Sequence, residues 1–327
     1  MKNVFVTGAT GFIGTALCKR LLEEGLFVYG TVRSLQTSIL SQGVEPVQFE
    51  SIEKKGKWET ILNDIDTIVH LAGRVHMMEG SAKYDSSKYH KVNLQGSQSL
   101  ALAAVKYGVK RFIFMSSVKV NGEGKSKPYK EIDIQDPQDP YAISKWKAEQ
   151  ALSEIIDQTK MDLVVLRLPL VYGPGVKGNF LRLLEVIECG IPLPLASINS
   201  RRSLIYLENL VDAIITCITH PKAAGNTYLV SDGEDVSTPE LIRRISFALG
   251  RSTKLFPFPP VMLKMAGIIT GKSAVMDRLI GSLTVDCSKI RRELDWQAPF
   301  SMEQGLKETA KWYLKRKNIS PKGANKL

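Results

Sequence analysis

The chain has 327 residues, of which 44% are hydrophobic and 24% are charged, a composition typical of globular proteins. This length is enough for a large core and for two domains or lobes. The formal net charge is +11, and six basic residues with no acid lie between Lys311 and Leu327. We expect a solvated basic tail over residues 314–327 and positive charge for an anionic ligand, rather than nucleic-acid or membrane binding.

Cysteine usage and the N-terminal segment favour a reducing compartment. The four cysteines lie far apart without a CxxC pair, so we expect no disulfide framework and no metal site. The opening MKNVFVTGAT has one basic residue and a short apolar run, which predicts a first strand and no signal peptide. No apolar run approaches the ~20 residues that span a bilayer. These features predict a cytoplasmic protein.

Strand and helix patterns alternate through the first half of the chain. Short apolar runs alternate with segments of helical spacing, several of which end at a glycine. The predicted strands are 3–8, 27–33, 66–73, 111–117 and 162–173, and the predicted helices are 15–25, 94–109 and 141–156. Such alternation predicts an α/β fold, a doubly wound parallel sheet of the Rossmann type with helices on both faces.

The pattern changes after Tyr172, where the breaker cluster GPGVKG begins. Beyond it we expect helices at 180–190 and 208–220, a strand at 203–207 and a proline-dense segment at 256–262. We predict a first domain over residues 1–172 and a second, smaller α/β lobe mainly over 173–327. Residues 204–220 are expected to return to the first domain, and a cleft is expected between the lobes.

A glycine-rich loop joins the first predicted strand to the first helix. VTGATGFIG places three glycines at intervals of three residues. The backbone of such a loop can approach a pyrophosphate, and the helix N-terminus adds amide donors and a positive dipole. Residues 1–172 are therefore predicted to be a dinucleotide-binding Rossmann domain. The expected cofactor contacts in this loop are Gly8, Thr10, Gly11, Phe12, Ile13 and Gly14.

The end of the second strand bears on the choice of dinucleotide. An acidic residue there would accept hydrogen bonds from the ribose hydroxyls of NAD. This strand instead ends with Thr31 and Val32, followed by Arg33 and Ser34. A guanidinium at Arg33 could pair with a 2′-phosphate. We therefore expect NADP(H), with NAD(H) as the alternative.

Several motifs in a fixed order carry a family resemblance. With the glycine loop, HLAG, FMSS and YAISK, the chain resembles the extended short-chain dehydrogenase/reductase superfamily, and within it the nucleotide-sugar epimerase, dehydratase and reductase group. The resemblance runs from Lys2 to about Tyr313 and includes LVYGPG, GNFLRLL and RRSLIYLENLVDAI. It implies that Leu71, Ala72, Gly73 and Pro169 lie beside the cofactor. It also implies a homodimer through helices near 93–107 and 141–157, the first rich in alanine.

The candidate catalytic residues are Ser117, Tyr141 and Lys145, which match the serine and the YxxxK pair of the family. A phenol has a pKa near 10 and is a poor proton shuttle near neutrality. An ammonium one helical turn away should lower that pKa toward the working pH. The resemblance adds that Lys145 also holds the nicotinamide ribose, that Ser117 hydrogen-bonds the reacting oxygen, and that Asn93 supports the site. We interpret His70 as a core residue.

The second ligand is expected to be a UDP-linked sugar. The resemblance matches Asn179 and Arg202 to residues that meet the diphosphate, and Arg278 by a looser alignment. A guanidinium makes paired hydrogen bonds to phosphate oxygens, so arginines suit this task. The expected substrate-binding residues are Ser117, Asn179, Arg202 and Arg278.

Two reactions fit these residues best. The first is NADPH-dependent reduction of the C4 keto group of a UDP-linked 4-keto sugar, namely a 4-keto-6-deoxy-N-acetylhexosamine. The alternative is a UDP-hexose 4-epimerase, acting on UDP-glucose or UDP-GlcNAc with bound NAD. A dehydratase is less favoured, since Val118 and Lys119 stand where the resemblance implies acids. A catalytically silent NADP-sensing protein is disfavoured because Tyr141 and Lys145 are both present.

Overall fold

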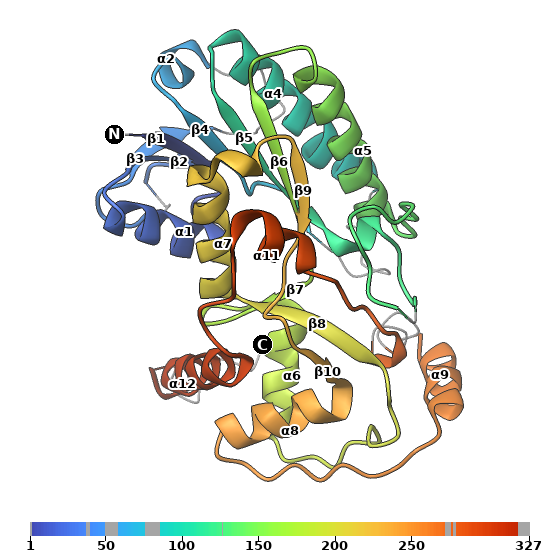
Figure 1. The fold of residues 1–327 in the computed structure, drawn as a ribbon. Coiled ribbons are helices and arrows are strands. Elements are labelled where there is room, and N and C mark those ends of the chain that lie inside the picture. Colours follow the sequence, from blue (N-terminus) through green and yellow to red (C-terminus); the bar gives the residue numbers. More distant parts are fainter. Residues whose placement is uncertain are drawn as a thin grey trace.

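The computed structural model describes residues 2–36, 40–49, 58–75, 86–125, 127–271, 276 and 279–319. Its strands form one seven-stranded sheet and a second sheet of three strands. The two sheets lie one after the other along the long axis of the molecule (Figure 1). The strands are β1 (Asn3–Thr7), β2 (Phe27–Val32), β3 (Glu45–Gln48), β4 (Thr67–His70), β5 (Arg111–Ser117), β6 (Asp162–Leu168), β7 (Leu170–Tyr172), β8 (Arg201–Tyr206), β9 (Asn226–Leu229) and β10 (Asp235–Ser237).

Helices cover both faces of the large sheet and surround the small one (Figure 1). The α-helices are α1 (Phe12–Glu23), α2 (Glu59–Leu62), α3 (Ser86–Tyr89), α4 (Gly96–Lys106), α5 (Pro140–Ile156), α6 (Gly178–Glu188), α7 (Leu207–Thr219), α8 (Thr238–Ala248), α9 (Pro260–Ile269), α11 (Ser288–Leu294) and α12 (Met302–Ile319). A π-helical segment, η1 (His90–Gln95), joins α3 to α4, and the short 3₁₀ segments are η2 (Val118–Val120) and η3 (Pro221–Ala223).

The seven-stranded sheet is parallel throughout, in the order β3-β2-β1-β4-β5-β6-β9. The order of the strands reverses between β1 and β4, because the chain builds outward from this pair on both sides. In open parallel sheets, ligands bind beyond the carboxyl ends of the strands at such a switch point. The predicted α/β class with a doubly wound parallel sheet is confirmed.

Alternation along β1 divides the core into two halves. Val4 and Val6 belong to the cluster that includes α1 and α7, whereas Phe5 belongs to the cluster that includes α4 and α5. The alanines Ala101, Ala103 and Ala104 of α4 are buried within this second cluster. These alanines therefore pack within the core of a single chain, and they do not form the exposed surface of small residues that was expected at a dimer interface. The homodimer remains a prediction.

The predicted strand 162–173 is wrong in one respect, because it is two strands. Pro169 lies between them and cannot donate a backbone hydrogen bond to a ladder. β6 pairs in the large sheet, whereas β7 pairs with β8 in the small one. The chain thus passes from one sheet to the other directly after β6. Later it returns, since α7 packs on α1 and β9 pairs with β6.

The predicted solvated tail is also partly wrong, because α12 continues to Ile319. The Tyr313 hydroxyl donates to Glu188, and the Lys317 ammonium lies 2.7 Å from the same carboxylate. Residues 314–319 are therefore helical and tied to α6. In the described part of the chain, none of the helices has the length and apolar character needed to cross a membrane.

Candidate active site

The glycine loop follows β1 at the switch point of the large sheet. Gly8 has a φ of +71° and its carbonyl accepts a 2.9 Å hydrogen bond from the Gly11 amide. A β-carbon on Gly14 would lie 2.2 Å from the Gly8 carbonyl oxygen, so only glycine fits there. A β-carbon on Gly8 would press on the Ala72 backbone nitrogen at 3.0 Å. The loop therefore needs glycine for close backbone packing between β1, α1 and the turn after β4.

The N-terminus of α1 has the character of an anion site. Its N-cap, Gly11, provides no side-chain hydrogen bond, and no acidic residue lies in the first turn. The first amides and the helix dipole are therefore available to a phosphate. Phe12 is half-buried and a β-carbon on Gly175 would contact its ring at 3.4 Å, so the loop also meets the segment after β7. These features fit a dinucleotide pyrophosphate.

The end of β2 supports the loop without adding a charge. The Thr31 hydroxyl accepts a 2.9 Å hydrogen bond from the Gly8 amide, a contact that the sequence did not reveal. Val32 is buried, and Arg33 is exposed directly after the strand. No carboxylate stands at this strand end in the described chain, so the residues fit NADP and do not exclude NAD.

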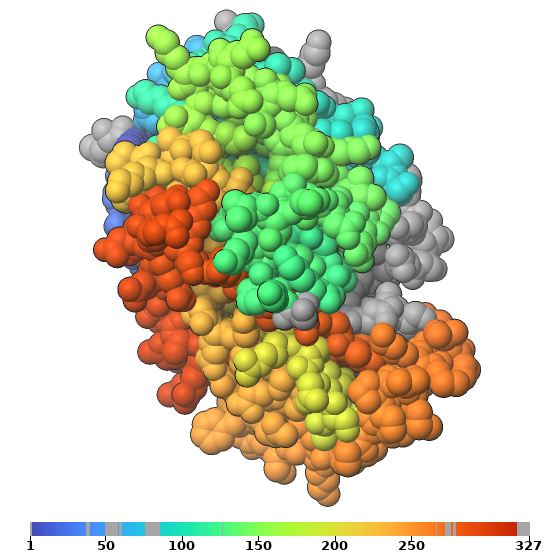
Figure 2. All heavy atoms as spheres, turned by 45° about the vertical axis from the view of Figure 1, so that its right-hand side comes forward, coloured from blue at the N-terminus to red at the C-terminus, as the bar shows by residue number. Residues whose placement is uncertain are grey.

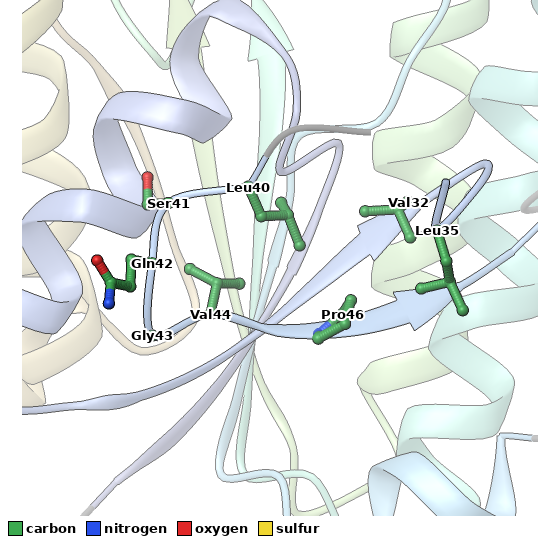
Figure 3. A pocket seen from close by; sticks show the side chains of 8 residues that line it. All are labelled: Val32, Leu35, Leu40, Ser41, Gln42, Gly43, Val44 and Pro46. Atoms are coloured by element: carbon green, nitrogen blue, oxygen red, sulfur yellow. The ribbon is translucent and has the colours of Figure 1, made fainter. Parts of the chain in front are cut away.

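A pocket of about 220 Å³ lies beside this strand end, between β2 and β3 (Figure 3). Its described lining carries no charged side chain, so it offers no group that distinguishes a ribose hydroxyl from a phosphate. The lining residues are Val32, Leu35, Leu40, Ser41, Gln42, Gly43, Val44 and Pro46.

Ser117 and Tyr141 meet at the carboxyl end of β5. Ser117 is the last residue of β5, and its side chain hydrogen-bonds the Tyr141 side chain in the first turn of α5. Asp139 caps α5 by accepting from the Ala142 amide at 2.7 Å. Lys119, just after Ser117, forms an ion pair with Asp139 at 2.7 Å. This pair joins the segments that carry the two hydroxyl groups.

The expected lowering of the Tyr141 pKa is wrong for this structure. Burial raises the pKa of Tyr141 to about 12, and this effect outweighs the hydrogen bond from Ser117, which lowers the pKa. Lys145 does not offset the burial, because its ammonium donates to the Met115 carbonyl at 2.7 Å. Tyr141 is therefore a neutral phenol near pH 7, the form that can donate a proton.

Lys145 lies on the same helix as Tyr141 and faces the turn after β4. A β-carbon built on Gly73 would be 3.4 Å from the Lys145 ammonium and 3.2 Å from the Asn93 amide oxygen. The Asn93 side chain accepts from the Arg74 amide and donates to the Ser144 hydroxyl, at 2.7 and 2.9 Å. Asn93 thus joins η1 to α5 and to the turn after β4. Leu71 and Ala72 lie in this turn, half-buried.

His70 connects the two cofactor segments through neutral hydrogen bonds. Burial and the nearby Lys145 charge lower the pKa of His70 to about 3, so it is neutral. Its Nδ1 lies 2.6 Å from the Thr7 hydroxyl, which accepts from the Ala72 amide. Its Nε2 lies 2.9 Å from the Ser97 hydroxyl, which donates to the Asn93 carbonyl. We assign the proton to Nε2, because the Ser97 hydrogen is already used.

A buried ion pair lies beneath the site. Arg167 on β6 makes a bidentate contact with Glu149 on α5, the shortest distance being 2.7 Å. Glu149 also accepts from the Ser116 hydroxyl, and its charge favours the ammonium of Lys145. Arg167 in addition donates to the Asn121 side chain at 3.1 Å. Glu149 was not predicted from the sequence, although its position four residues after Lys145 on the same helix could have indicated it.

The predicted substrate residues lie on separate elements after residue 173. Asn179 is exposed in the first turn of α6, whose N-cap makes no side-chain hydrogen bond. Arg202 is half-buried on β8, opposite Val236 of β10. Arg278 lies outside the described residues. Pro169 is buried directly after β6, whose last residue, Leu168, pairs with Ser117. In the described chain, no cluster of three His, Cys, Asp or Glu side chains could hold a metal ion.

The fold and the sequence place the chain in a known class of enzyme. Residues 4–231 match the model of the NAD dependent epimerase/dehydratase family. The chain belongs to this family and is an oxidoreductase-type enzyme of the extended short-chain dehydrogenase/reductase group.

Several proteins of similar sequence or structure are nucleotide-sugar or glycosyl-diphosphate epimerases by name. A UDP-glucose 4-epimerase of Vibrio cholerae is 41% identical over 97% of both chains. An N-acetyl-α-D-glucosaminyl-diphospho-ditrans,octacis-undecaprenol 4-epimerase of Escherichia coli O157:H7 is 28% identical over 95% of both. The solved UDP-glucose 4-epimerase of Thermotoga maritima with UDP-glucose has a TM-score of 0.78 at 24% identity, covering 97% of this chain and all of the other. The Thermus thermophilus enzyme with NAD has a TM-score of 0.76 at 21% identity, covering 95% and 99%.

Proposed function

We propose that this chain is a C4 epimerase of a UDP-linked hexose, acting with a tightly held nicotinamide dinucleotide. The observation that carries this proposal is the hydrogen-bonded pair of Ser117 and Tyr141 at the carboxyl end of β5, with Lys145 on the same helix as Tyr141. The 41% identical relative named as a UDP-glucose 4-epimerase supports the reaction and the sugar nucleotide. Neighbours of the same fold described with NAD or UDP-glucose support the two ligands.

Each residue has a distinct task in this proposal. The nicotinamide, when bound, supplies the hydride acceptor and donor. Tyr141 takes the proton of the sugar 4-hydroxyl during oxidation and returns it to the C4 oxygen during reduction. The Ser117 hydroxyl hydrogen-bonds that same oxygen and orients it. Lys145, whose ammonium here donates to the Met115 carbonyl, would hold the nicotinamide ribose and move its charge toward the phenol when the cofactor is bound. The glycine loop and the α1 N-terminus hold the pyrophosphate.

Two observations favour a second candidate, reduction of a UDP-linked 4-keto sugar such as a 4-keto-6-deoxy-N-acetylhexosamine. No carboxylate stands at the end of β2 in the described chain, which suits NADPH, the usual reducing cofactor. Tyr141 is protonated near neutral pH, and keto reduction needs a proton donor. Epimerisation also requires the phenol to act as a base, so Lys145 must come closer to Tyr141 than it does here.

One assay separates the two candidates. Purified protein is incubated with UDP-glucose or UDP-GlcNAc without added cofactor, and the C4 epimers are resolved by chromatography. In parallel, NADPH or NADH is added with a UDP-4-keto-6-deoxy-N-acetylhexosamine, and cofactor absorbance is followed. Epimer formation without net cofactor change supports the epimerase. Stoichiometric cofactor oxidation without epimer formation supports the reductase instead. If neither epimer formation nor cofactor oxidation is observed, both candidates are rejected.

A further inference from the structure

Helix α9 carries an apolar surface that the proposed catalytic function does not use. The exposed fractions of Val261, Met262, Met265, Ile268 and Ile269 are 69%, 51%, 57%, 69% and 82%. Monomeric proteins rarely expose large apolar side chains in such a contiguous group. Of this helix, Leu263 and Gly267 are buried, one turn apart, so a narrow stripe anchors α9 while most of its surface faces outward.

The helix stands at the margin of the molecule. In Figure 1, α9 lies to the side of the small sheet, and in Figure 2 the orange segment projects from the surface. Among the described elements, none makes extensive contact with α9. Phe256, in the proline-rich segment before the helix, is 43% exposed and extends the apolar character of this region.

The charged residues next to α9 along the chain are basic. Within the described residues 252–271 the charged side chains are Lys254 and Lys264, and both are exposed. An apolar helix face with lysine at its border matches segments that lie in the headgroup region of a bilayer, where anionic lipids attract the basic groups. A second copy of the chain fits less well, because a two-fold contact would bring identical lysines together without an acid in this segment.

We propose that α9 and the preceding segment dock this enzyme on an anionic membrane surface, as a peripheral contact without a span. The inserted side chains are Met265, Ile268 and Ile269, and Lys254 and Lys264 meet lipid phosphates. This surface lies apart from the basic tail. From the sequence we expected no membrane binding, and this proposal departs from that expectation because the exposure of the apolar face follows only from the fold.

Vesicle sedimentation with the full-length protein tests the docking. Vesicles of phosphatidylcholine alone are compared with vesicles that also contain phosphatidylglycerol, at low and high salt. Wild type should sediment with the anionic vesicles, less at high salt and less with the neutral ones. The double variant Met265→Glu/Ile268→Glu should lose roughly tenfold or more of this partitioning, because two inserted apolar side chains become charged.

The matched control is Phe247→Glu, which makes the same kind of change at a residue that is 78% exposed on α8. It should sediment like wild type. Circular dichroism verifies that each variant is folded. Absence of wild-type sedimentation, or equal sedimentation of wild type and the double variant, overturns the proposal. Concentration-dependent self-association that the double variant abolishes, without vesicle binding, overturns it in favour of a second copy.

Discussion

Lys145 carries a charge in a place that disfavours charge. Burial lowers the pKa of Lys145 from 10.5 to about 8, and the Glu149 carboxylate only partly offsets this. The unfolded chain therefore binds this proton more tightly than the folded one. The resulting loss of stability is fully present below pH 8 and disappears as the pH rises from about 8 to about 10.5. The fold thus gives up stability at neutral pH to keep a buried ammonium on the helix that carries Tyr141.

Lys145→Met should stabilise the protein at pH 7 while abolishing turnover. We expect the free energy of unfolding to rise by about 1–3 kcal/mol, allowing for the lost hydrogen bond to Met115. Urea unfolding of wild type and variant at several pH values measures the difference, which should shrink above pH 8. Lys147→Met, at an exposed position of the same helix, should change stability little. A less stable Lys145→Met protein at pH 7 would contradict this account.

The pair of Arg167 and Glu149 should behave in the opposite way. Arg167→Met leaves a buried carboxylate without its partner, so the free energy of unfolding should fall by about 3–5 kcal/mol. The double variant Glu149→Leu/Arg167→Met removes both charges and should recover most of this loss. Arg243→Met, which breaks an exposed ion pair with Glu240, should cost about 0.5 kcal/mol or less. A double variant as unstable as Arg167→Met would show that the charge pairing is not the cause.

Among the elements, the loop between β1 and α1 has the tightest geometry of the predicted cofactor site. Its shape requires glycine at position 14, because the Gly8 carbonyl occupies the space that a β-carbon on Gly14 would need. The Gly8 amide is at the same time fixed by Thr31 on the neighbouring strand. The loop is therefore formed before any ligand binds, which reduces the entropy lost on binding.

Gly14→Ala should weaken dinucleotide binding by about tenfold or more, since the loop must open to admit a methyl group. Isothermal titration with NAD and with NADP measures this loss. Gly25→Ala is the control, because Gly25 has a φ of +75° but open space around it. That change should cost about 1 kcal/mol of stability and leave the dinucleotide affinity as it was. Equal affinities for wild type and Gly14→Ala would remove the loop from the cofactor site.

Elements with a clear hydrophobic pattern over consecutive residues could be predicted from the sequence. β5 was predicted as 111–117 and spans those residues, because a continuous apolar run is typical of a buried parallel strand. α5 was found from its periodic pattern, and the capping residue Asp139 fixes its start. The short strands β3, β9 and β10 were missed, since three or four residues have no clear period. The raised pKa of Tyr141 also could not be read from the YxxxK spacing, because burial depends on the tertiary structure.

At the scale of the whole molecule, the two sheets divide the work that we propose. The large sheet carries the dinucleotide loop and the reacting hydroxyl groups, and the elements around the small sheet carry Asn179 and Arg202. Arg202 and Arg201 are neighbours on β8, so their side chains leave opposite faces of the strand. We therefore expect only one of these two arginines to contact a ligand bound on a given face of β8.

Arg202→Ala should raise the dissociation constant for UDP by about tenfold or more, because a guanidinium can make two hydrogen bonds to a diphosphate. Dinucleotide affinity should stay the same, since the glycine loop lies on the other sheet. Arg201→Ala is the neighbouring control and should bind UDP like wild type. Titration calorimetry with each ligand separates the two sites, and unchanged UDP affinity in Arg202→Ala would exclude that residue from substrate binding.

The most direct test of the central claim is the rate of C4 chemistry in Tyr141→Phe. This change removes only the phenolic oxygen, so the fold and the dinucleotide affinity should be those of wild type. We expect turnover of the sugar nucleotide, whether by epimerisation or by keto reduction, to fall by about 10²–10⁴-fold, the usual contribution of a general acid–base group. Turnover within a factor of about two of wild type, with the protein folded and its cofactor bound, would contradict the role of this phenol in proton transfer.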